Sequence, residues 1–423
     1  MNNLSRRNFL GASFALVTLS RCADVIKKNK LLPLNSKLVL LGDSITHMGM
    51  YNAVEEGQSS KPGLSFTNQG YGNLANILSG SRYLVPLYGN QGKNADTVAG
   101  VLSRTDAVIA LQPAIVILLI GINSIFHNVP EESIKNDYES ICKRLVEAGA
   151  IVIAPTILPC FPGQYGALTS SQEELRQKIN SFILSLSAIK SVDAELYMND
   201  SKYFIDGLHP NAIGACRLGS KVAPILSSLI LPGKIHDAKN KLNNYVTNPL
   251  LKGTKGKLEK ATGVVADNWT LVADNSGAAT VTACKSPNDG KQLIQVAGSY
   301  SGKDKNLLLR SKKIAALNKD EVIEGILDIE ILTAYTNIST IDLVIEGFNA
   351  NNELVMAGQA FYEASHLPMQ LPVGGYTLRT PPQKLISSVA TVTGSILIMF
   401  MDVVADSKIE GTFKIHNCTI TKM

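Results

Sequence analysis

Long apolar runs are missing from the 423-residue sequence once its N-terminus is set aside, because no stretch reaches the ~18 residues of a spanning helix. This absence excludes a polytopic membrane protein. The six cysteines are scattered, with no C-x-x-C pair and no metal-ligand spacing, so we expect free thiols and no metal site. In an oxidising compartment, one disulfide between Cys284 and Cys418 is the alternative. Aromatic residues make up only 6% of the chain, and we expect the single tryptophan, Trp269, in a core.

An excess of one charge is also absent from most of the chain. The formal net charge is +5, but residues 1–30 contain six Arg or Lys and one Asp, so the remainder carries 34 positive and 34 negative side chains. No broad basic surface for nucleic acid is therefore expected. With 45% hydrophobic and 18% charged residues, the chain is globular, and its length suggests two or three domains of roughly 150 residues.

The N-terminus has the pattern of a targeting segment. Residues 5–10 (SRRNFL) precede an uncharged run over 11–20, and this order resembles a twin-arginine export signal. A basic amphipathic helix is the alternative. The residues before Cys22 are similar to a lipoprotein site except for Arg21, so a lipid anchor at Cys22 stays open. We expect an exported protein, periplasmic or extracellular, with residues 1–30 outside the fold and no transmembrane span after signal removal.

Residues 31–233 alternate short aliphatic runs with amphipathic segments. The aliphatic runs have the continuous apolar character of strands in a parallel sheet, and they cover 37–41, 83–88, 114–120 and 150–157. The expected helices are 70–78, 96–111, 131–148, 171–188 and 211–229. This alternation predicts a doubly wound α/β domain with three layers and a parallel sheet, as in flavodoxin-like folds.

After residue 233 the pattern changes to period-two alternation. Residues 234–259 are polar and are expected to be a linker, and residues 260–423 are expected to form an antiparallel β-sandwich. The expected strands are 325–332, 340–346, 395–404 and 411–421, with residues 349–352 (NANN) turning a hairpin. Residues 248–250 through 267–269 loosely resemble the opening of jelly-roll carbohydrate-binding modules, which implies a jelly-roll-like domain.

Candidate catalytic residues follow the predicted strands of the α/β domain. Ser44 comes just after the first strand, at the edge of the sheet where open α/β folds bind ligands. A serine hydroxyl needs a base, and Asp206 and His209 are spaced so that the carboxylate holds one imidazole nitrogen while the other faces the serine. Gly92 and Asn123 also follow predicted strands. Taken singly, these residues could be a helix N-cap, an exposed turn, a turn residue and a loop glycine.

Together and in this order, the four pieces resemble the SGNH (GDSL) hydrolase superfamily. The matching blocks are Gly42-Asp43-Ser44-Ile45, Asn90-x-Gly92, Gly121-x-Asn123 and Asp206-x-x-His209. The resemblance implies that Ser44 is the nucleophile, His209 the general base and then acid, and Asp206 the residue that orients His209. It also implies an oxyanion hole made by the backbone N–H groups of Ser44 and Gly92 and the side chain of Asn123, and a reaction that needs no cofactor. Ser124 departs from the aspartate usual in the third block, which puts the support of the Asn123 loop in doubt.

Other residues near these blocks are candidates for substrate contact. They are Asp43, His47 and Asn90, although a surface histidine of a helix is the alternative for His47. Cys160 and Tyr165 lie in the loop after the fourth strand and are expected to line the same pocket.

The resemblance implies a serine esterase that works through an acyl-enzyme. We expect short-acyl esters, above all acetyl groups on carbohydrate, so the expected partner is an acetylated polysaccharide and not a nucleic acid. The alternatives are a lipid-directed esterase or lysophospholipase, and a surface glycan-binding protein with a weakly active hydrolase fold. The sequence leaves open the acyl group, the alcohol and the oligomeric state.

Overall fold

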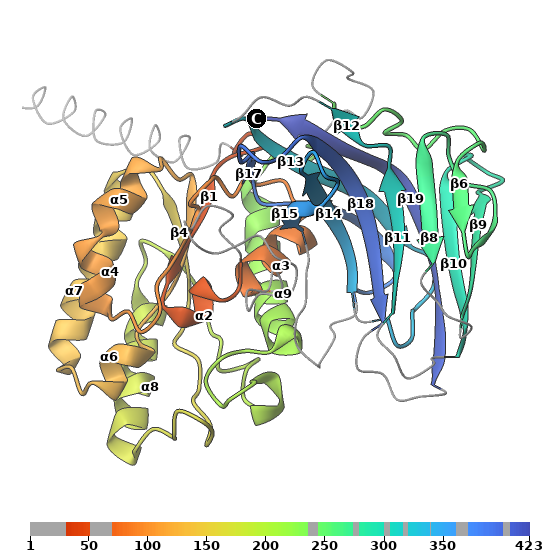
Figure 1. Cartoon of the computed structure of the whole chain (residues 1–423). Helices are drawn as coiled ribbons and strands as arrows, with labels where there is room; N and C mark the ends of the chain where they lie inside the picture. The colour runs from red at the N-terminus through yellow and green to blue at the C-terminus, as the bar shows by residue number, and fades with distance from the viewer. Residues whose placement is uncertain are drawn as a thin grey trace, which may run out of the picture.

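The computed structural model describes residues 31–50, 70–235, 244–273, 279–299, 305–315, 320–338, 340–360, 371–400 and 407–423. The predicted export signal with Cys22, and part of the predicted linker, lie outside these ranges. Figure 1 places a sheet flanked by helices beside a larger assembly of strands. We call the first, with β1–β5, the α/β part, and the second, with β6–β19, the β part. No helix in the described ranges is long and apolar enough to cross a membrane.

The sheet of the α/β part is parallel, with strand order β2-β1-β3-β4-β5. Its strands are β1 (Leu38–Gly42), β2 (Asn90–Gly92), β3 (Ile115–Leu119), β4 (Ile151–Pro155) and β5 (Lys190–Val192). The order reverses between β1 and β3, which is the switch point beside which doubly wound folds bind ligands. The predicted doubly wound α/β fold is confirmed.

Helices cover both faces of this sheet (Figure 1). They are α2 (Ser44–His47), α3 (Tyr71–Leu78), α4 (Val98–Ser103), α5 (Thr105–Ala110), α6 (Ile122–Phe126), α7 (Glu131–Glu147), α8 (Ser170–Ser185) and α9 (Ala212–Leu229), with a 3-10 turn at Ser201–Tyr203. Alternate residues of β1 serve the two faces: Leu38 and Leu40 belong to the core that contains α3 and α9, and Val39 and Leu41 to the core of α4 and α7. Both faces are apolar, so the three inner strands, β1, β3 and β4, are continuous hydrophobic runs.

Two predictions for this part were wrong in detail. Residues 83–88 form no strand beyond one bridge from Leu84 to Lys37; Pro86 interrupts them, Tyr88 has φ +61°, and pairing with β1 starts only at Asn90. The helix expected over 96–111 is two helices, α4 and α5, which meet at Arg104.

The β part contains two seven-stranded sheets. The first has β16 (Gly374–Arg379), β13 (Val322–Ile331), β19 (Lys408–Lys422), β10 (Gln292–Ser299), β9 (Ala279–Lys285) and β7 (Thr262–Gly263) in that order, with β17 (Gln383–Lys384) also on β13. The second has β15 (Leu354–Gln359), β14 (Thr340–Phe348), β18 (Thr391–Phe400), β11 (Lys305–Ser311), β8 (Trp269–Ala273) and β6 (Lys257–Glu259), with β12 (Ile314–Ala315) also on β18.

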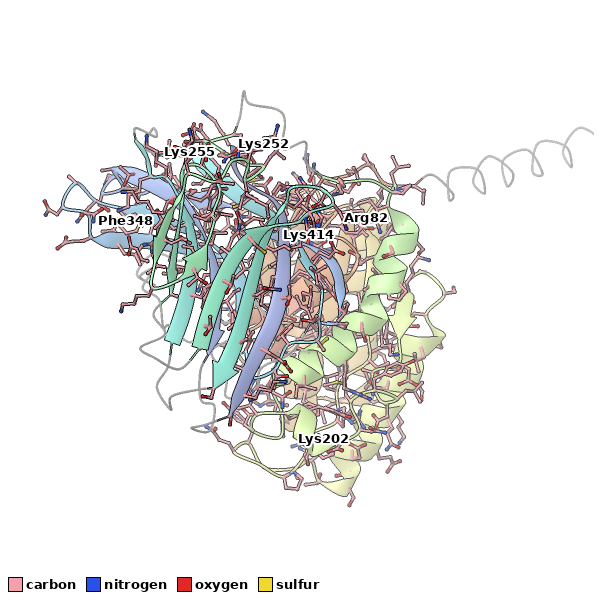
Figure 2. The ribbon with its side chains drawn as sticks, turned by 90° about the vertical axis from the view of Figure 1, so that its right-hand side faces the viewer. Arg82, Lys202, Lys252, Lys255, Phe348 and Lys414 are labelled. Atoms are coloured by element: carbon pink, nitrogen blue, oxygen red, sulfur yellow. The ribbon has the colours of Figure 1, made fainter. Side chains whose placement is uncertain are left out.

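These two sheets share one buried core, as expected for a β-sandwich. Trp269 is buried in it, as predicted, and donates its indole N–H to Asn248 O (2.9 Å). The hairpin predicted at 349–352 joins β14 to β15. On the first sheet, Lys414 of β19, labelled in Figure 2, pairs with Glu330 of β13. The strands pair antiparallel with two exceptions: β6 is parallel to β8, and β7 is parallel to β9. Residues 257–263 therefore run along the edges of both sheets, in the same direction as the strands beside them.

Polar contacts join the two parts where α3 and α9 face the β strands (Figure 1). Arg379 of β16 forms a two-pronged ion pair with Glu324 and donates to Asn35 Oδ1 (2.9 Å) and Tyr83 O (3.1 Å). Asn73 Nδ2 donates to Ala360 O (2.9 Å). The apolar core is continuous through this junction, from Leu38 of β1 to Ile420 of β19. The described cysteines, including Cys284 and Cys418, are free thiols.

Candidate active site

Ser44 lies at the carboxyl end of β1, where the strand turns into the short helix α2. It is the first residue of α2, so its N–H is among those that an α-helix leaves without a carbonyl partner. The preceding residue, Asp43, is buried and caps the helix by accepting the Ile45 N–H (3.0 Å). This turn sets Ser44 at the edge of the sheet, as predicted.

The loop that carries Asp206 and His209 reaches the same edge from the end of the α/β part. His209 Nε2 is 2.8 Å from Ser44 Oγ, and His209 Nδ1 is 2.7 Å from Asp206 Oδ2. Asp206 Oδ1 accepts the backbone N–H groups of Leu208 (3.0 Å) and His209 (2.8 Å). The three side chains therefore form one continuous hydrogen-bonded chain.

The turn beneath this chain depends on glycine. Gly207 has φ +87°, and a Cβ added there would lie 2.3 Å from Phe161 O. Phe161 N–H in turn donates to Gly207 O (2.8 Å) and Gln164 N–H donates to Asp206 O (3.1 Å), so the loop after β4 supports the loop of His209.

Hydrogen bonds fix the charge state of Asp206. Partial burial opposes its ionisation, but the His209 and Leu208 N–H groups and the His209 imidazole together lower its pKa. An ionised carboxylate only accepts hydrogen bonds, so the proton between the two residues belongs to His209 Nδ1. Nε2 of the neutral ring is then an acceptor and is placed to take the proton of Ser44 Oγ.

Asn123 comes to the site on α6, after β3. Its Nδ2 donates one hydrogen to Asp96 O (2.9 Å), which leaves the second hydrogen of the amide for another acceptor. Ser124, the departure from the family pattern, is buried and accepts the Val98 N–H (3.0 Å) with its Oγ. A serine thus ties α6 to the start of α4 and supports the Asn123 segment.

Gly92 lies in β2, beside the end of α2. A Cβ at this position would be 2.2 Å from His47 N, so the approach of the two backbones requires glycine. Its N–H donates to Asn90 Oδ1 (3.0 Å), and its carbonyl is 3.2 Å from His47 Nδ1. The Gly92 N–H predicted for the oxyanion hole therefore already has an acceptor within reach.

Two of the predicted substrate contacts are buried under α2. Asn90 donates through Nδ2 to the carbonyls of Thr46 (3.2 Å) and His47 (3.1 Å) at the C-terminal end of the short helix, and to that of Met50 (2.6 Å) in the turn after it. Asp43 caps the other end, and burial raises its pKa to about 7. Because both side chains serve the backbone of α2, we no longer expect either to contact a substrate.

An exposed ledge borders His209. Residues 162–167 of the loop after β4 are all exposed, and Tyr165 in this segment packs edge-on against the His209 ring, with 5.3 Å between centroids. Cys160 lies two residues before the ledge, and burial raises the pKa of its thiol.

Sequence reasoning missed Arg104 and Asp96. They form an ion pair (2.8 Å) and bond the backbone of Gly42 and Gln91 and the side chain of Asn123. Both lie in what looked like one amphipathic helix, and no local spacing indicated that they serve the site. Within the described ranges, no cluster of three or more His, Cys, Asp or Glu could hold a metal ion.

The GDSL-like Lipase/Acylhydrolase family matches residues 40–215. No curated protein matches the sequence. Similar solved structures include LAE5, an alpha/beta hydrolase from the metagenome of Lake Arreo (20% identity, 47% of this chain and 99% of that one, TM-score 0.37). Another is a catalytic mutant of the acetylxylan esterase Axe2 of Geobacillus stearothermophilus (18% identity, 48% of this chain and 100% of that one, TM-score 0.38). A third is a lipase/acylhydrolase of Enterococcus faecalis (18% identity, 47% of this chain and 99% of that one, TM-score 0.37).

The matched segment begins within β1, two residues before Gly42, and ends within α9, so it contains Ser44, Gly92, Asn123, Asp206 and His209. Residues 40–215 therefore belong to the GDSL-like lipase/acylhydrolase family and form an ester hydrolase domain.

Proposed function

We propose that this domain hydrolyses carboxylic esters through an acyl-enzyme on Ser44. The observation that carries the proposal is the hydrogen-bonded chain from Ser44 Oγ to His209 Nε2 (2.8 Å) and from His209 Nδ1 to Asp206 Oδ2 (2.7 Å). A nucleophile, a base within hydrogen-bonding reach and a third group that orients the base are the parts that acyl transfer requires.

In the first half of the reaction, Ser44 Oγ attacks the ester carbonyl carbon while its proton passes to His209 Nε2. The imidazolium that forms is stabilised by the ionised Asp206. His209 then gives this proton to the oxygen of the departing alcohol, and the acyl group stays on Ser44. In the second half, His209 takes a proton from water, the hydroxide oxygen attacks the acyl carbon, and the acid leaves as Ser44 Oγ regains a proton.

The negative charge on the tetrahedral intermediate needs donors that are already in place. We assign the Ser44 N–H and the second hydrogen of Asn123 Nδ2 as principal donors, because neither is committed to a described acceptor. The Gly92 N–H is a third donor, which shares its hydrogen with Asn90 Oδ1. One such donor is typically worth about 100- to 1,000-fold in kcat.

For the substrate, we propose short-acyl esters on carbohydrate, acetyl esters above all. The ledge of residues 162–167 beside His209 is open and rich in small and polar residues, with Tyr165 as a half-exposed ring on which a sugar could rest. A long acyl chain would instead favour an apolar channel. Trp269 is buried in the β part, so it is no sugar platform. The export signal of residues 1–30, which would bring the enzyme to extracellular polysaccharide, belongs to the same proposal.

The test measures hydrolysis of p-nitrophenyl acetate, butyrate and octanoate by wild type, Ser44→Ala and a control, Ser181→Ala. Ser181 lies on the exposed face of α8 and bonds only Gln177 O among described residues. We expect activity that falls with chain length, disappears in Ser44→Ala and persists in the control. Equal rates in wild type and Ser44→Ala would contradict the esterase, and a maximum at octanoate would contradict the short-acyl substrate.

The carbohydrate is tested separately with Tyr165→Ala. On an acetylated xylo-oligosaccharide, this variant should raise KM several-fold, while KM for p-nitrophenyl acetate changes little because that ester carries no sugar. The same change in KM for both esters would contradict a sugar-binding role of Tyr165.

A further inference from the structure

We propose that Arg104 is a positioning residue that holds all three segments of the oxyanion hole in register. The inference rests on the proposed function, because it concerns how the same site stabilises negative charge. Arg104 touches none of the reacting atoms; it would act through the backbone of the segments that carry the donors.

The guanidinium of Arg104 bonds three segments that are far apart in the chain. Its Nη2 donates to Gly42 O (3.0 Å) at the end of β1, and its Nη1 donates to Gln91 O (2.7 Å) in β2. Its Nε donates to Asp96 Oδ2 (2.8 Å) in the segment before α4. One planar group thus joins the ends of two neighbouring strands and the start of a helix.

Each of these contacts lies next to one proposed donor. Gln91 O belongs to the same peptide plane as the Gly92 N–H, and in a trans peptide the two point in opposite directions, so holding the carbonyl sets the direction of the N–H. Gly42 is two residues before Ser44, and its carbonyl also accepts the Lys93 N–H (3.1 Å), which ties β1 to β2. Asp96 holds Asn123, because its backbone carbonyl accepts Asn123 Nδ2 (2.9 Å).

The site demands arginine in particular. Three acceptors in three directions match the fork of a guanidinium, whereas a lysine ammonium is a point charge on a flexible chain and cannot keep this geometry. The arrangement is also sheltered: the side chain of Arg104 is 21% exposed and that of Asp96 is 7% exposed. The helix expected over 96–111 is interrupted at Arg104, the residue whose side chain turns toward the strand ends.

The experiment compares kcat and KM of Arg104→Gln, Arg104→Lys, Asn123→Ala and the double variant Arg104→Gln/Asn123→Ala on p-nitrophenyl acetate. We expect Arg104→Gln to lose about 30-fold in kcat, less than the loss of a whole donor because the donors are misplaced and not removed, with KM changed less than about threefold. Arg104→Lys should recover only a small part. Because both residues serve one hole, the loss caused by Arg104→Gln should be at least about fivefold smaller in the Asn123→Ala background.

Arg144→Gln is the matched control. Arg144 also binds a carbonyl and a carboxylate, those of Leu102 and Asp106, and is similarly exposed, but bonds no strand end at the site. It should keep wild-type kcat, and thermal melts followed by circular dichroism check that each variant is folded at the assay temperature. If Arg104→Gln does not fold, Arg104→Lys replaces it in the comparison of kcat and KM with and without Asn123→Ala.

Three results would overturn the inference. They are a kcat of Arg104→Gln within twofold of wild type, an equal loss of kcat from Arg104→Gln with Asn123 and with Asn123→Ala, or an increase in KM with no change in kcat. Failure of the proposed function has a different signature, since wild type would then be no faster than Ser44→Ala before any change at Arg104.

Discussion

Replacing Asp206 by Asn tests whether Asp206 sets the tautomer of His209 that the reaction needs. Asp206 Oδ1 accepts two backbone N–H groups, from Leu208 and His209. In the variant, the amide oxygen should accept these two backbone N–H groups, because an amide NH2 in its place would put donor against donor. The amide nitrogen then faces His209 Nδ1 and donates to it, so the imidazole must carry its proton on Nε2, toward Ser44 Oγ.

The size of the effect follows from this tautomer. A ring protonated at Nε2 cannot accept the Ser44 proton, and the same change in a Ser-His-Asp protease costs about ten-thousandfold in kcat. That factor corresponds to about 5.4 kcal/mol in the activation free energy. The fold should lose far less, on the order of 1 kcal/mol in the free energy of unfolding, because the two backbone bonds to Oδ1 remain.

The assay is steady-state hydrolysis of p-nitrophenyl acetate with urea denaturation of the same preparations. Asp193→Asn is the control, since Asp193 also accepts a backbone N–H two residues on, that of Glu195 (3.1 Å). It should keep full activity. The reasoning is refuted if Asp206→Asn retains more than about a tenth of wild-type kcat, or if its lost activity is matched by a lost fold.

Three further predictions concern stability. Gly92→Ala should lose about 1–3 kcal/mol in the free energy of unfolding and most of its kcat, because the new Cβ would lie 2.2 Å from His47 N; a wild-type melting temperature would contradict this. Burial raises the pKa of Asp43 from 3.8 to about 7, so the folded chain favours the neutral acid and loses stability as the pH rises through that interval. The stability of Asp43→Asn relative to wild type should therefore increase by about 1.4 kcal/mol per pH unit up to pH ~7, as measured by urea denaturation, and a pH-independent difference would count against the assignment. Arg379→Gln should cost about 3–5 kcal/mol, because it leaves Glu324 buried without its partner, and the double variant Arg379→Met/Glu324→Leu should recover much of that loss. If the double variant is no more stable than Arg379→Gln, the loss does not come from the stranded charge.

The parts of the fold that the sequence predicted well have strong periodic patterns. β1, β3 and β4 are uninterrupted aliphatic runs, and α7 and α9 are long amphipathic segments, so burial on the two faces of the sheet dictates both. Ser44 and Asn123 were predicted at the edge of the sheet because each follows a strand, β1 and β3, whereas Gly92, expected behind a strand over 83–88, is itself the last residue of β2. The proximity of His209 to Ser44 came from the motifs, which the structure then placed within hydrogen-bonding distance.

The rest depends on tertiary contacts that leave no local pattern. β2 and β5 are three-residue strands that contain polar residues and pair with β1 and β4, so no long apolar run marks them in the sequence. Asn90 looked like a polar residue for substrate, yet its amide bonds two carbonyls of α2 and that of Met50 just beyond it, a use fixed by how closely α2 approaches β2. Arg104 is likewise invisible in sequence, because its three acceptors come from three different segments.

The contact of Arg379 with the Tyr83 carbonyl also bears on when the protein can fold during synthesis. The two residues are 296 positions apart, which at ~5–20 residues per second corresponds to roughly 15–60 s of translation. For the last 150 of these positions, roughly 8–30 s at the same rate, α3 and α9 are both complete but Arg379 of β16 has not yet been made. During this time the apolar surfaces of α3 and α9 are exposed on the nascent chain, and they need protection from aggregation until the later strands emerge.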